Sequence, residues 1–241
     1  MGHEVKIQET NKAKLKEMMK EYNVETFRNS LDVDAVCVVT PSDTHYDIVK
    51  HWLSNSVHVF CEKPLCFSYE QAKELITLAE KKNRILAVGH VFRFTNGAKL
   101  FKELCNLIEP KHITMNFLND KPPRKDSNIM YNLAIHYLDL LDYVGFGKGK
   151  ISYHSIEKFN GIIRLEYHNC SVYIYVAYSA DEKKRIIKLE CDGIEIEIDL
   201  AVNNNEPLKE ELKHFIKCIE NNTYPVNYAE AEIIRTLENL R

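Results

Sequence analysis

The sequence Val57-His58-Val59-Phe60-Cys61-Glu62-Lys63-Pro64-Leu65 decides the fold, because it joins an apolar strand to the approach of a helix. Residues 57–60 carry the β-branched and aromatic side chains that strands favour. Ser68 and Gln71 follow at the spacing of a capping box, which predicts that a helix begins there. Ligands of α/β proteins bind where the strands of the parallel sheet end. Lys63 therefore lies where we expect a residue that takes part in chemistry.

Strand and helix patterns alternate before and after this stretch. Residues 35–39 are continuously apolar, which is typical of a parallel strand covered on both faces, and residues 85–88 predict another strand. A shorter strand is predicted at residues 5–8. Helical spacing of apolar residues occupies the segments between these strands, namely 12–22, 44–54 and 69–82. The alternation predicts an α/β fold with a doubly wound parallel sheet.

The pattern changes after about residue 94. Helices are predicted at residues 96–107 and 130–143, and a series of strand-like segments with short turns follows between residues 151 and 200. Consecutive strands with short turns form antiparallel sheets. We therefore divide the chain into residues 1–94, a parallel α/β domain, and residues 95–241, an α+β domain with a large, mostly antiparallel open sheet.

Composition argues against several classes of function. The chain has 32 Lys and Arg against 35 Asp and Glu, a formal charge of −3, which gives no electrostatic basis for nucleic-acid binding. No apolar run approaches the roughly 20 residues of a membrane span, and the first residues show no signal-peptide pattern. Seven cysteines without a Cys-x-x-Cys pair argue against a disulfide framework and a zinc site. We expect a cytoplasmic protein without a bound metal.

Four phrases follow one another along the chain. They are Val38-Val39-Thr40-Pro41-Ser42-Asp43-Thr44-His45, Cys61-Glu62-Lys63-Pro64-Leu65, Val88-Gly89-His90-Val91-Phe92-Arg93-Phe94 and Asn132-x-x-x-His136-x-x-Asp139. In order and spacing they resemble the Gfo/Idh/MocA family, named after glucose–fructose oxidoreductase, inositol 2-dehydrogenase and rhizopine catabolism. The resemblance covers nearly the whole chain. It implies a Rossmann-like dinucleotide-binding domain followed by a substrate-binding and oligomerisation domain.

The resemblance also implies an activity. Family members are NAD(P)-dependent oxidoreductases that move hydride between nicotinamide and a hydroxyl carbon of a sugar or nucleotide sugar. Asn132 stands where many members carry aspartate. Asn-x-x-x-His is similar to members that oxidise C3 of UDP-N-acetylhexosamine or its uronic acid. The implied partner is a small-molecule sugar or nucleotide sugar, with no nucleic acid and no membrane.

One feature of the family is missing from the sequence. Members begin with a Gly-x-Gly-x-x-Gly turn whose amides hold the cofactor pyrophosphate, and these 241 residues contain no such turn. We therefore expect an N-terminally truncated Rossmann-like sheet, without its first βα unit. Either the sequence is a fragment or the chain does not bind dinucleotide in the usual way. The alternative function is a cofactor-free binding or assembly protein that keeps the fold.

Three residues form the predicted catalytic set: Lys63, His136 and Asn132. A lysine after a strand is usually solvated, and a histidine on an apolar helix face is usually a packed core residue. The resemblance instead implies that Lys63 stabilises alkoxide charge and shares in proton transfer, and that neutral His136 takes the hydroxyl proton. Asn132, four residues before His136 on the same helical face, would hydrogen-bond a neighbouring sugar hydroxyl. Asp139 orients His136 or forms a surface pair.

A second set is predicted to contact the cofactor. The resemblance places Thr40 and Pro41 against the ribose and nicotinamide, and Glu62 contacts the ribose or orients Lys63. Glu9, after the first strand, would bind the adenosine ribose and favour NAD over NADP, unless it is a solvated acid. The complete set is Glu9, Thr40, Pro41, His45, Glu62, Lys63, Pro64, His90 and Arg93.

Simpler interpretations compete with these assignments. Residues 40–45 are equally typical of a helix N-terminus. Arg93 holds either an anionic ligand or a surface acid. Pro64 is implied to follow a cis peptide bond.

Two further stretches indicate contacts outside these sets. The basic loop Lys121-Pro122-Pro123-Arg124-Lys125 is either solvated or a lid that meets a substrate diphosphate. Tyr173, Tyr175 and Tyr178 alternate with apolar residues along a predicted strand. An open sheet with such a face commonly pairs with a second copy of itself, which predicts a homodimer or homotetramer.

Overall fold

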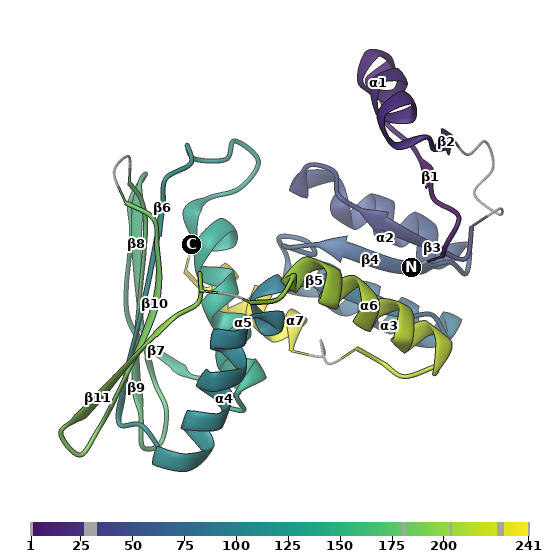
Figure 1. Cartoon of the computed structure of the whole chain (residues 1–241). Coiled ribbons are helices and arrows are strands. Elements are labelled where there is room, and N and C mark those ends of the chain that lie inside the picture. Colours follow the sequence, from purple (N-terminus) through teal and green to yellow (C-terminus); the bar gives the residue numbers. More distant parts are fainter. Residues whose placement is uncertain (1, 27–32, 180–181, 203, 226–228, 241) are drawn as a thin grey trace.

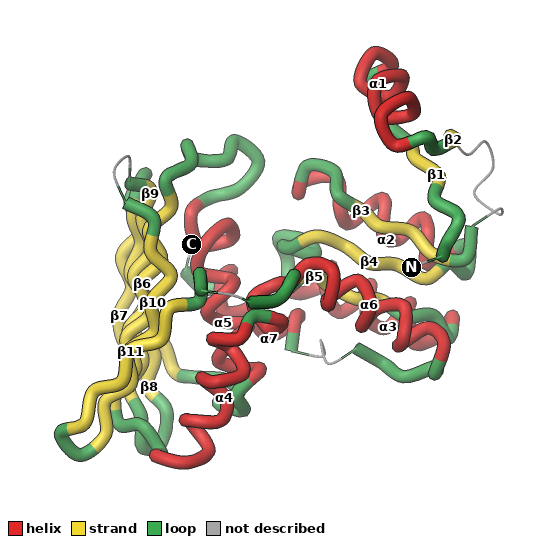
Figure 2. Tube along the Cα trace, in the orientation of Figure 1, coloured by secondary structure: helices red, strands yellow, loops and turns green. Residues whose placement is uncertain are grey.

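The computed structural model describes residues 2–26, 33–179, 182–202, 204–225 and 229–240. Two blocks of strands stand apart, with helices between and around them (Figures 1 and 2). One block is a three-stranded parallel sheet and the other is a six-stranded sheet, while two short strands near the N-terminus form a further pair. None of the helices in these ranges is long and apolar enough to span a bilayer.

The parallel sheet has its strands in sequence order, β3 (Ala35–Val38), β4 (His58–Glu62) and β5 (Leu86–Gly89). Helix α2 (His45–Ser54) connects the first two strands and helix α3 (Tyr69–Lys82) the second two. The two helices pack against each other, because right-handed connections in one direction place both on the same face of the sheet.

Side chains of β4 alternate between the two faces of the sheet. Val59 and Cys61 belong to the core that includes α2 and α3. Phe60 faces α6 (Pro207–Glu220) and meets Phe215 with ring centroids 5.7 Å apart. Helices therefore cover both faces of the sheet, which confirms the predicted doubly wound architecture. The covering helix α6 follows the second sheet in the chain and returns to the first.

The first elements form a small unit beside this sheet. β1 (Lys6–Ile7) pairs in parallel with β2 (Glu25–Thr26), and α1 (Lys12–Tyr22) connects them. α1 buries none of its residues, and it projects away from β3 (Figure 1). The strand predicted at residues 5–8 is therefore present but, in the described ranges, it pairs outside the parallel sheet. Two residues supply few ladder hydrogen bonds, and α1 offers no buried face to hold the unit against β3.

The larger sheet has the strand order β11-β10-β6-β9-β8-β7. β6 and β9 pair in parallel, and all other neighbours are antiparallel, which confirms the predicted mostly antiparallel sheet. We call the part of the molecule around the parallel sheet the first lobe and the part around the six-stranded sheet the second lobe. Helix α4 (Asn96–Ile108) leads from the first lobe into the second. The strands of the six-stranded sheet are β6 (His112–Asn119), β7 (Lys150–Ile156), β8 (Asn160–Glu166), β9 (Ser171–Tyr178), β10 (Lys184–Cys191) and β11 (Ile194–Asp199).

Helix α5 (Ile135–Tyr143) lies between the two lobes and follows a π-helical stretch at Met130–Ala134. It packs against α7 (Glu230–Glu238), which also contacts α3. Hydrophobic residues of both sheets and of these helices form one continuous core. These contacts hold the ends of β4 and β5 next to α5.

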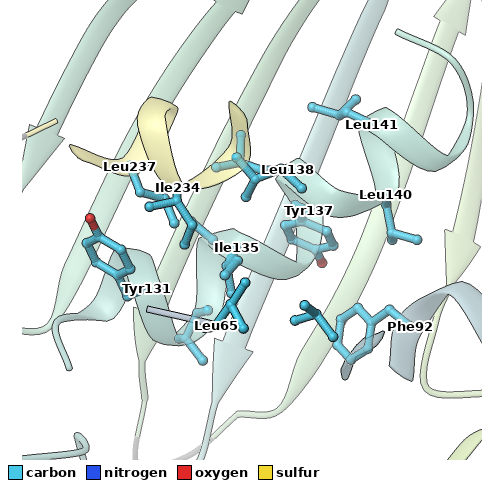
Figure 3. Packing of buried hydrophobic residues seen from close by; sticks show 14 of the residues in the cluster. Leu65, Phe92, Tyr131, Ile135, Tyr137, Leu138, Leu140, Leu141, Ile234 and Leu237 are labelled. Atoms are coloured by element: carbon cyan, nitrogen blue, oxygen red, sulfur yellow. The ribbon is translucent and has the colours of Figure 1, made fainter. Parts of the chain in front are cut away.

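The packing around α5 is visible in Figure 3. Leu65, which closes the Cys61–Leu65 phrase, lies beside Ile135, with Ile234 of α7 on the other side. All three side chains are completely buried. The segment that carries Lys63 is thus held against the helix that carries His136.

Candidate active site

Lys63 follows the last residue of β4, and the Lys63–Pro64 peptide bond is cis, as the resemblance implied. The side chain of Lys63 reaches across to the second lobe. Its Nζ atom donates to the main-chain oxygen of Asn132 at 2.6 Å and to the side-chain Oδ1 of Asn132 at 3.1 Å. Lys63 exposes only 8% of its surface, so it is not an ordinary solvated lysine.

Burial lowers the pKa of Lys63 to about 8, and the positive charge of Arg124 acts in the same direction. The negative charges of Glu62 and Asp126 oppose this shift. A basic group is most useful in proton transfer when its pKa lies near the working pH. The electrostatics of the site therefore make Lys63 a group that can hold or release a proton.

Asn132 lies in the π-helical stretch that precedes α5. Such stretches are rare and occur frequently at functional sites. The side-chain Nδ2 of Asn132 donates to the hydroxyl of Tyr178 at 2.6 Å. Tyr178, Asn132 and Lys63 thus form a hydrogen-bonded chain from β9 to the end of β4. Partners on both ends of the amide fix its orientation.

His136 comes four residues after Asn132 and is almost completely buried. Its ring stacks on Phe92, with centroids 4.3 Å apart and an angle of 16° between the planes. The Nδ1 atom is buried and makes no hydrogen bond within the described part of the chain. Burial, followed by the positive charge of Lys63, holds the pKa of His136 well below its ordinary value. The imidazole is therefore neutral and lies close enough to Lys63 to sense its charge.

His45 and Glu62 belong to the framework at the ends of β3 and β4. The His45 ring lies 2.7 Å from the main-chain oxygen of Pro64 through Nδ1 and 2.9 Å from that of Thr40 through Nε2. It is buried and ties the two strand ends together. The Glu62 carboxyl lies against Gly89, where an added Cβ would meet it at 3.2 Å. The glycine at the end of β5 leaves this space to the acid.

The basic loop before α5 lies over the end of β3. Asp126 accepts hydrogen bonds from the Ser42 main-chain N–H at 3.0 Å and from the Ser42 hydroxyl at 3.1 Å. Arg124 donates to the same carboxylate, and this hydrogen bond is the main reason that the pKa of Asp126 is lowered. A groove lies between this loop and the residues that follow β3. It is lined by Val39, Thr40, Pro41, Arg124, Lys125 and Asp126.

His90 and Arg93 are bound by acids of α5 and α7. His90 Nε2 lies 2.6 Å from Glu230, and Nδ1 lies 3.6 Å from Asp139. Arg93 donates through Nε to Asp139 at 2.8 Å and through Nη2 to Asp142 at 3.0 Å. Both side chains are buried. We predicted that His90 and Arg93 contact the cofactor. In the structure, carboxylates of α5 and α7 lie at the end of β5 and bind these two side chains.

Glu9 lies in the small N-terminal unit and not with the other predicted residues. Its carboxylate accepts from the main-chain N–H of Asn11 at 3.0 Å and pairs with Lys14 at 3.1 Å. The hydrogen bond from Asn11 is the main cause of the lowered pKa of Glu9, and the contact with Lys14 adds to it. The structure therefore places Glu9 as an acid at the start of α1.

Two residues of the site were not predicted from the sequence, Tyr178 and Asp126. Tyr178 was grouped with Tyr173 and Tyr175 on one face, and this was wrong. Residues 172, 174 and 176 are buried, so the period of two in β9 puts Tyr178 on the inner face and Tyr173 on the outer face. Counting that period is the signal that would have found Tyr178. Asp126 carries no such signal, because its partner Ser42 is 84 residues away.

Comparison with known proteins supports the resemblance. Residues 3–90 match the family described as "Oxidoreductase family, NAD-binding Rossmann fold". A UDP-N-acetylglucosamine 3-dehydrogenase of Acidithiobacillus ferrooxidans is 32% identical over 110 residues, which are 45% of this chain and 35% of that protein. A 2,7-anhydro-N-acetylneuraminate hydratase of Mediterraneibacter gnavus is 35% identical over 86 residues, 36% of this chain and 23% of that protein. The matched segments thus span about a third or less of these curated relatives.

Comparison of the folds finds a likeness that covers most of the chain. A solved structure of UDP-N-acetylglucosamine 3-dehydrogenase from Acidithiobacillus ferrooxidans superposes with a TM-score of 0.85 and 19% identity. The superposition covers 96% of this chain and 86% of that one. At this identity the likeness shows the fold, which includes the six-stranded sheet.

Proposed function

We propose, from the premise that residues 3–90 belong to the Gfo/Idh/MocA oxidoreductase family, that this chain transfers hydride between nicotinamide and a hydroxyl carbon of a sugar or nucleotide sugar. One observation carries the proposal. Lys63 from the parallel sheet meets Asn132 from the second lobe at 2.6 Å, with neutral His136 beside them. A buried amine with a pKa near the working pH, placed beside a neutral imidazole, can accept the proton of a bound alcohol.

The groove at the end of β3 fits the nicotinamide half of a dinucleotide. Its walls are the main chain around Thr40 and Pro41, at the edge of a parallel sheet where such ligands bind. When bound, the nicotinamide accepts or returns the hydride at its C4 atom. We propose NAD, the cofactor that the family description names. We assign no residue of this sequence to the pyrophosphate, because it contains no glycine-rich turn.

The proposed proton acceptor is the neutral amine of Lys63. An uncharged amine has two N–H bonds, and the two oxygens of Asn132 accept both of them. The nitrogen lone pair is then left for the proton of the substrate hydroxyl. After transfer, the third N–H of the ammonium donates to the product oxygen. The pKa of about 8 suits this exchange, because neither protonation state is strongly disfavoured near neutral pH.

His136 and Asn132 complete the proposed set. The low pKa of His136 makes its imidazole a weak base but leaves it uncharged, so it holds the hydroxyl by a hydrogen bond. This division of roles differs from the sequence-based expectation, in which His136 takes the proton. Asn132 holds the Lys63 amine in place. We reassign His90 and Arg93 to positioning α5 through Asp139.

A nucleotide-activated N-acetylhexosamine is the proposed substrate. The relative and the solved structure with this chemistry in their names support it. The basic loop Lys121-Pro122-Pro123-Arg124-Lys125 borders the groove and supplies cations near it. We further propose a homodimer or homotetramer through the outer face of the six-stranded sheet, where Tyr153 and Tyr173 are exposed. Seven free cysteines support a reducing compartment such as the cytoplasm.

The direct test is an assay of the purified chain with NAD and UDP-N-acetylglucosamine. Reduction of the cofactor, followed by its absorbance, is expected only when both are present. Lys63→Met should abolish it, and Lys188→Met on the outer face of β10 should not. Saturable sugar binding without any cofactor reduction would contradict the proposal and favour the cofactor-free binding protein. Analytical ultracentrifugation of the same sample tests the oligomer.

A further inference from the structure

Arg185 lies on the inner face of the six-stranded sheet, near the site. It is directly opposite Phe117 in the pairing of β10 with β6. Ile187 and Leu189, two and four residues later, are buried on the same face. The strand therefore directs Arg185 toward α5 and not toward the outer surface.

The guanidinium group of Arg185 lies over two aromatic rings. Its Cζ atom is 5.1 Å from the centroid of Phe92 and 5.3 Å from that of Phe117. The Phe92 ring is also the one that stacks on His136. A single ring thus contacts both the guanidinium and the imidazole of the site. Consistent with this proximity, the charge of Arg185 contributes to the lowered pKa of His136.

Among the arginines in the described ranges, only Arg84 and Arg185 form no ion pair with an acid, and the negative charges of Asp120 and Asp199 act on Arg185 from a longer distance. Its Nε atom is buried without a hydrogen bond. Arg84 donates to main-chain oxygens. The remaining arginines pair with acids, as Arg93–Asp139, Arg124–Asp126, Arg164–Glu166 and Arg235–Glu232.

Arg185 is partly buried, with its Nε atom shielded from water, and an anion bound beside it would stabilise the guanidinium. Taking part of a cation out of water costs free energy, and contacts with aromatic rings return only a share of it. The cation also weakens His136 as a base. A site that keeps an arginine in this position gains when an oxyanion binds to it, because the planar guanidinium can donate two parallel hydrogen bonds to two oxygens of a carboxylate or a phosphate.

We propose that Arg185 binds an oxyanion of the substrate, a phosphate or a carboxylate, on the side of the reacting carbon where Phe92 and His136 lie. The assignment rests on the proposed function for the identity of the reaction. It makes Arg185 the residue that selects charged sugars over neutral ones. The two sources of the oxyanion are the diphosphate of a nucleotide sugar and the carboxylate of a uronic acid.

Isothermal titration calorimetry separates these sources without requiring turnover. The ligands are UDP-N-acetylglucosamine, glucuronate and neutral N-acetylglucosamine, each titrated with and without NADH. The proteins are wild type, Arg185→Met, Arg185→Lys and the control Arg164→Met. Arg164 is an exposed arginine of β8 whose neighbours in the strand, Ile163 and Leu165, are buried, so it faces away from the site. Thermal unfolding of each variant establishes that it is folded.

We expect wild type to bind at least one charged ligand about tenfold or more tightly than N-acetylglucosamine. Arg185→Met should remove that preference, since a hydrogen bond to a charged group contributes roughly 1.5–3 kcal/mol, which is about 10- to 150-fold in Kd. Arg185→Lys should keep part of it, and Arg164→Met all of it. Loss for UDP-N-acetylglucosamine alone identifies the diphosphate, and loss for glucuronate alone identifies the carboxylate.

Equal affinity of wild type for charged and neutral ligands, no binding of any charged ligand, or unchanged binding by Arg185→Met would each overturn the inference. These outcomes are distinct from a failure of the proposed function. If the affinity depends on Arg185 but no cofactor is reduced, the proposed dehydrogenase activity is contradicted and the proposed oxyanion site is supported. If the cofactor is reduced equally well by wild type and by Arg185→Met, the dehydrogenase activity is supported and the oxyanion site is contradicted.

Discussion

The Nζ atom of Lys63 lies 2.6 Å from the main-chain oxygen of Asn132 and 3.1 Å from its amide oxygen. The two residues belong to different lobes, since Lys63 directly follows β4 and Asn132 lies in the π-helical stretch before α5. One amine therefore links the end of a parallel strand to the helix that carries His136. Both the chemistry and the relative placement of the lobes depend on this contact.

The first prediction concerns the amine itself. Lys63→Met keeps most of the side-chain volume but removes the only group that we assign to proton transfer. We expect kcat to fall by about 10²- to 10⁴-fold, the usual contribution of general acid–base catalysis. Steady-state rates with NAD and UDP-N-acetylglucosamine measure it. The folded state should persist, because an apolar side chain suits this buried position better than an ammonium.

The control for Lys63→Met is Lys188→Met. Lys188 pairs with Glu195 and Glu197 on the outer surface of the sheet, where surface ion pairs contribute little to stability. Its activity should stay within about twofold of wild type. A Lys63→Met enzyme with near-normal kcat would show that the proton goes to another residue.

The second prediction is the pH dependence of alcohol oxidation. Burial lowers the pKa of Lys63 to about 8, and the neutral form is the proposed base. The rate should therefore rise about tenfold per pH unit below 8 and level off above it. Ketone reduction needs the ammonium, so it should fall above pH 8. Initial rates in both directions between about pH 6 and 10 test the sign.

Two neighbouring charges give this pH profile an internal check. The positive charge of Arg124 lowers the pKa of Lys63, and the negative charge of Asp126 raises it. Arg124→Gln should move the apparent pKa above 8, and Asp126→Asn should move it below 8. Shifts in the same direction for both variants would mean that the profile reports another group.

The pattern of apolar residues was sufficient to predict the parallel sheet and the antiparallel character of the second sheet. A continuous apolar run indicates a strand that is buried on both faces, and alternation with a period of two indicates a strand that is buried on one face. The parallel sheet shows the first kind of burial, and the six-stranded sheet shows the second. The order of the motifs led us to place Lys63 and His136 in one predicted site, and in the structure Lys63 contacts Asn132 and its charge acts on His136. The partners of Arg93 and His90 could not be predicted in this way. Asp139 and Glu230 lie 46 and 140 residues further along the chain, and no local pattern indicates which acid meets which base.

The third prediction tests the far end of the hydrogen-bonded chain. Tyr178→Phe removes the hydroxyl that accepts from Asn132 Nδ2 at 2.6 Å. The amide can then turn, and Lys63 loses one of its two acceptors. We expect kcat to fall about tenfold with a smaller change in KM, as one hydrogen bond of roughly 1–1.5 kcal/mol is lost. Tyr173→Phe on the opposite face of the same strand is the matched control, and an equal loss in both variants would argue against this role.

The fourth prediction concerns Glu211, a residue of α6 whose carboxyl is buried and faces His90, which only partly offsets the cost of burying a charge there. Burial raises its pKa from 4.5 to about 8, and the negative charge of Glu62 adds to the rise. The folded protein therefore keeps a proton that the unfolded chain releases above about pH 4.5. Stability attributable to Glu211 is present below pH 4.5 and is lost as the pH rises to 8.

Glu211→Gln removes this titration while keeping the size of the side chain. The variant should match wild type near pH 4.5 and become more stable than wild type by about 2–4 kcal/mol at pH 8, or roughly 5–15 °C in Tm. Thermal unfolding of both proteins across this range measures the difference. Glu210→Gln, at an exposed neighbour that pairs with Lys213, should show no such gain. A Tm difference between Glu211→Gln and wild type that does not grow with pH would mean that Glu211 is already ionised in the folded protein, because only a retained proton makes unfolding easier as the pH rises.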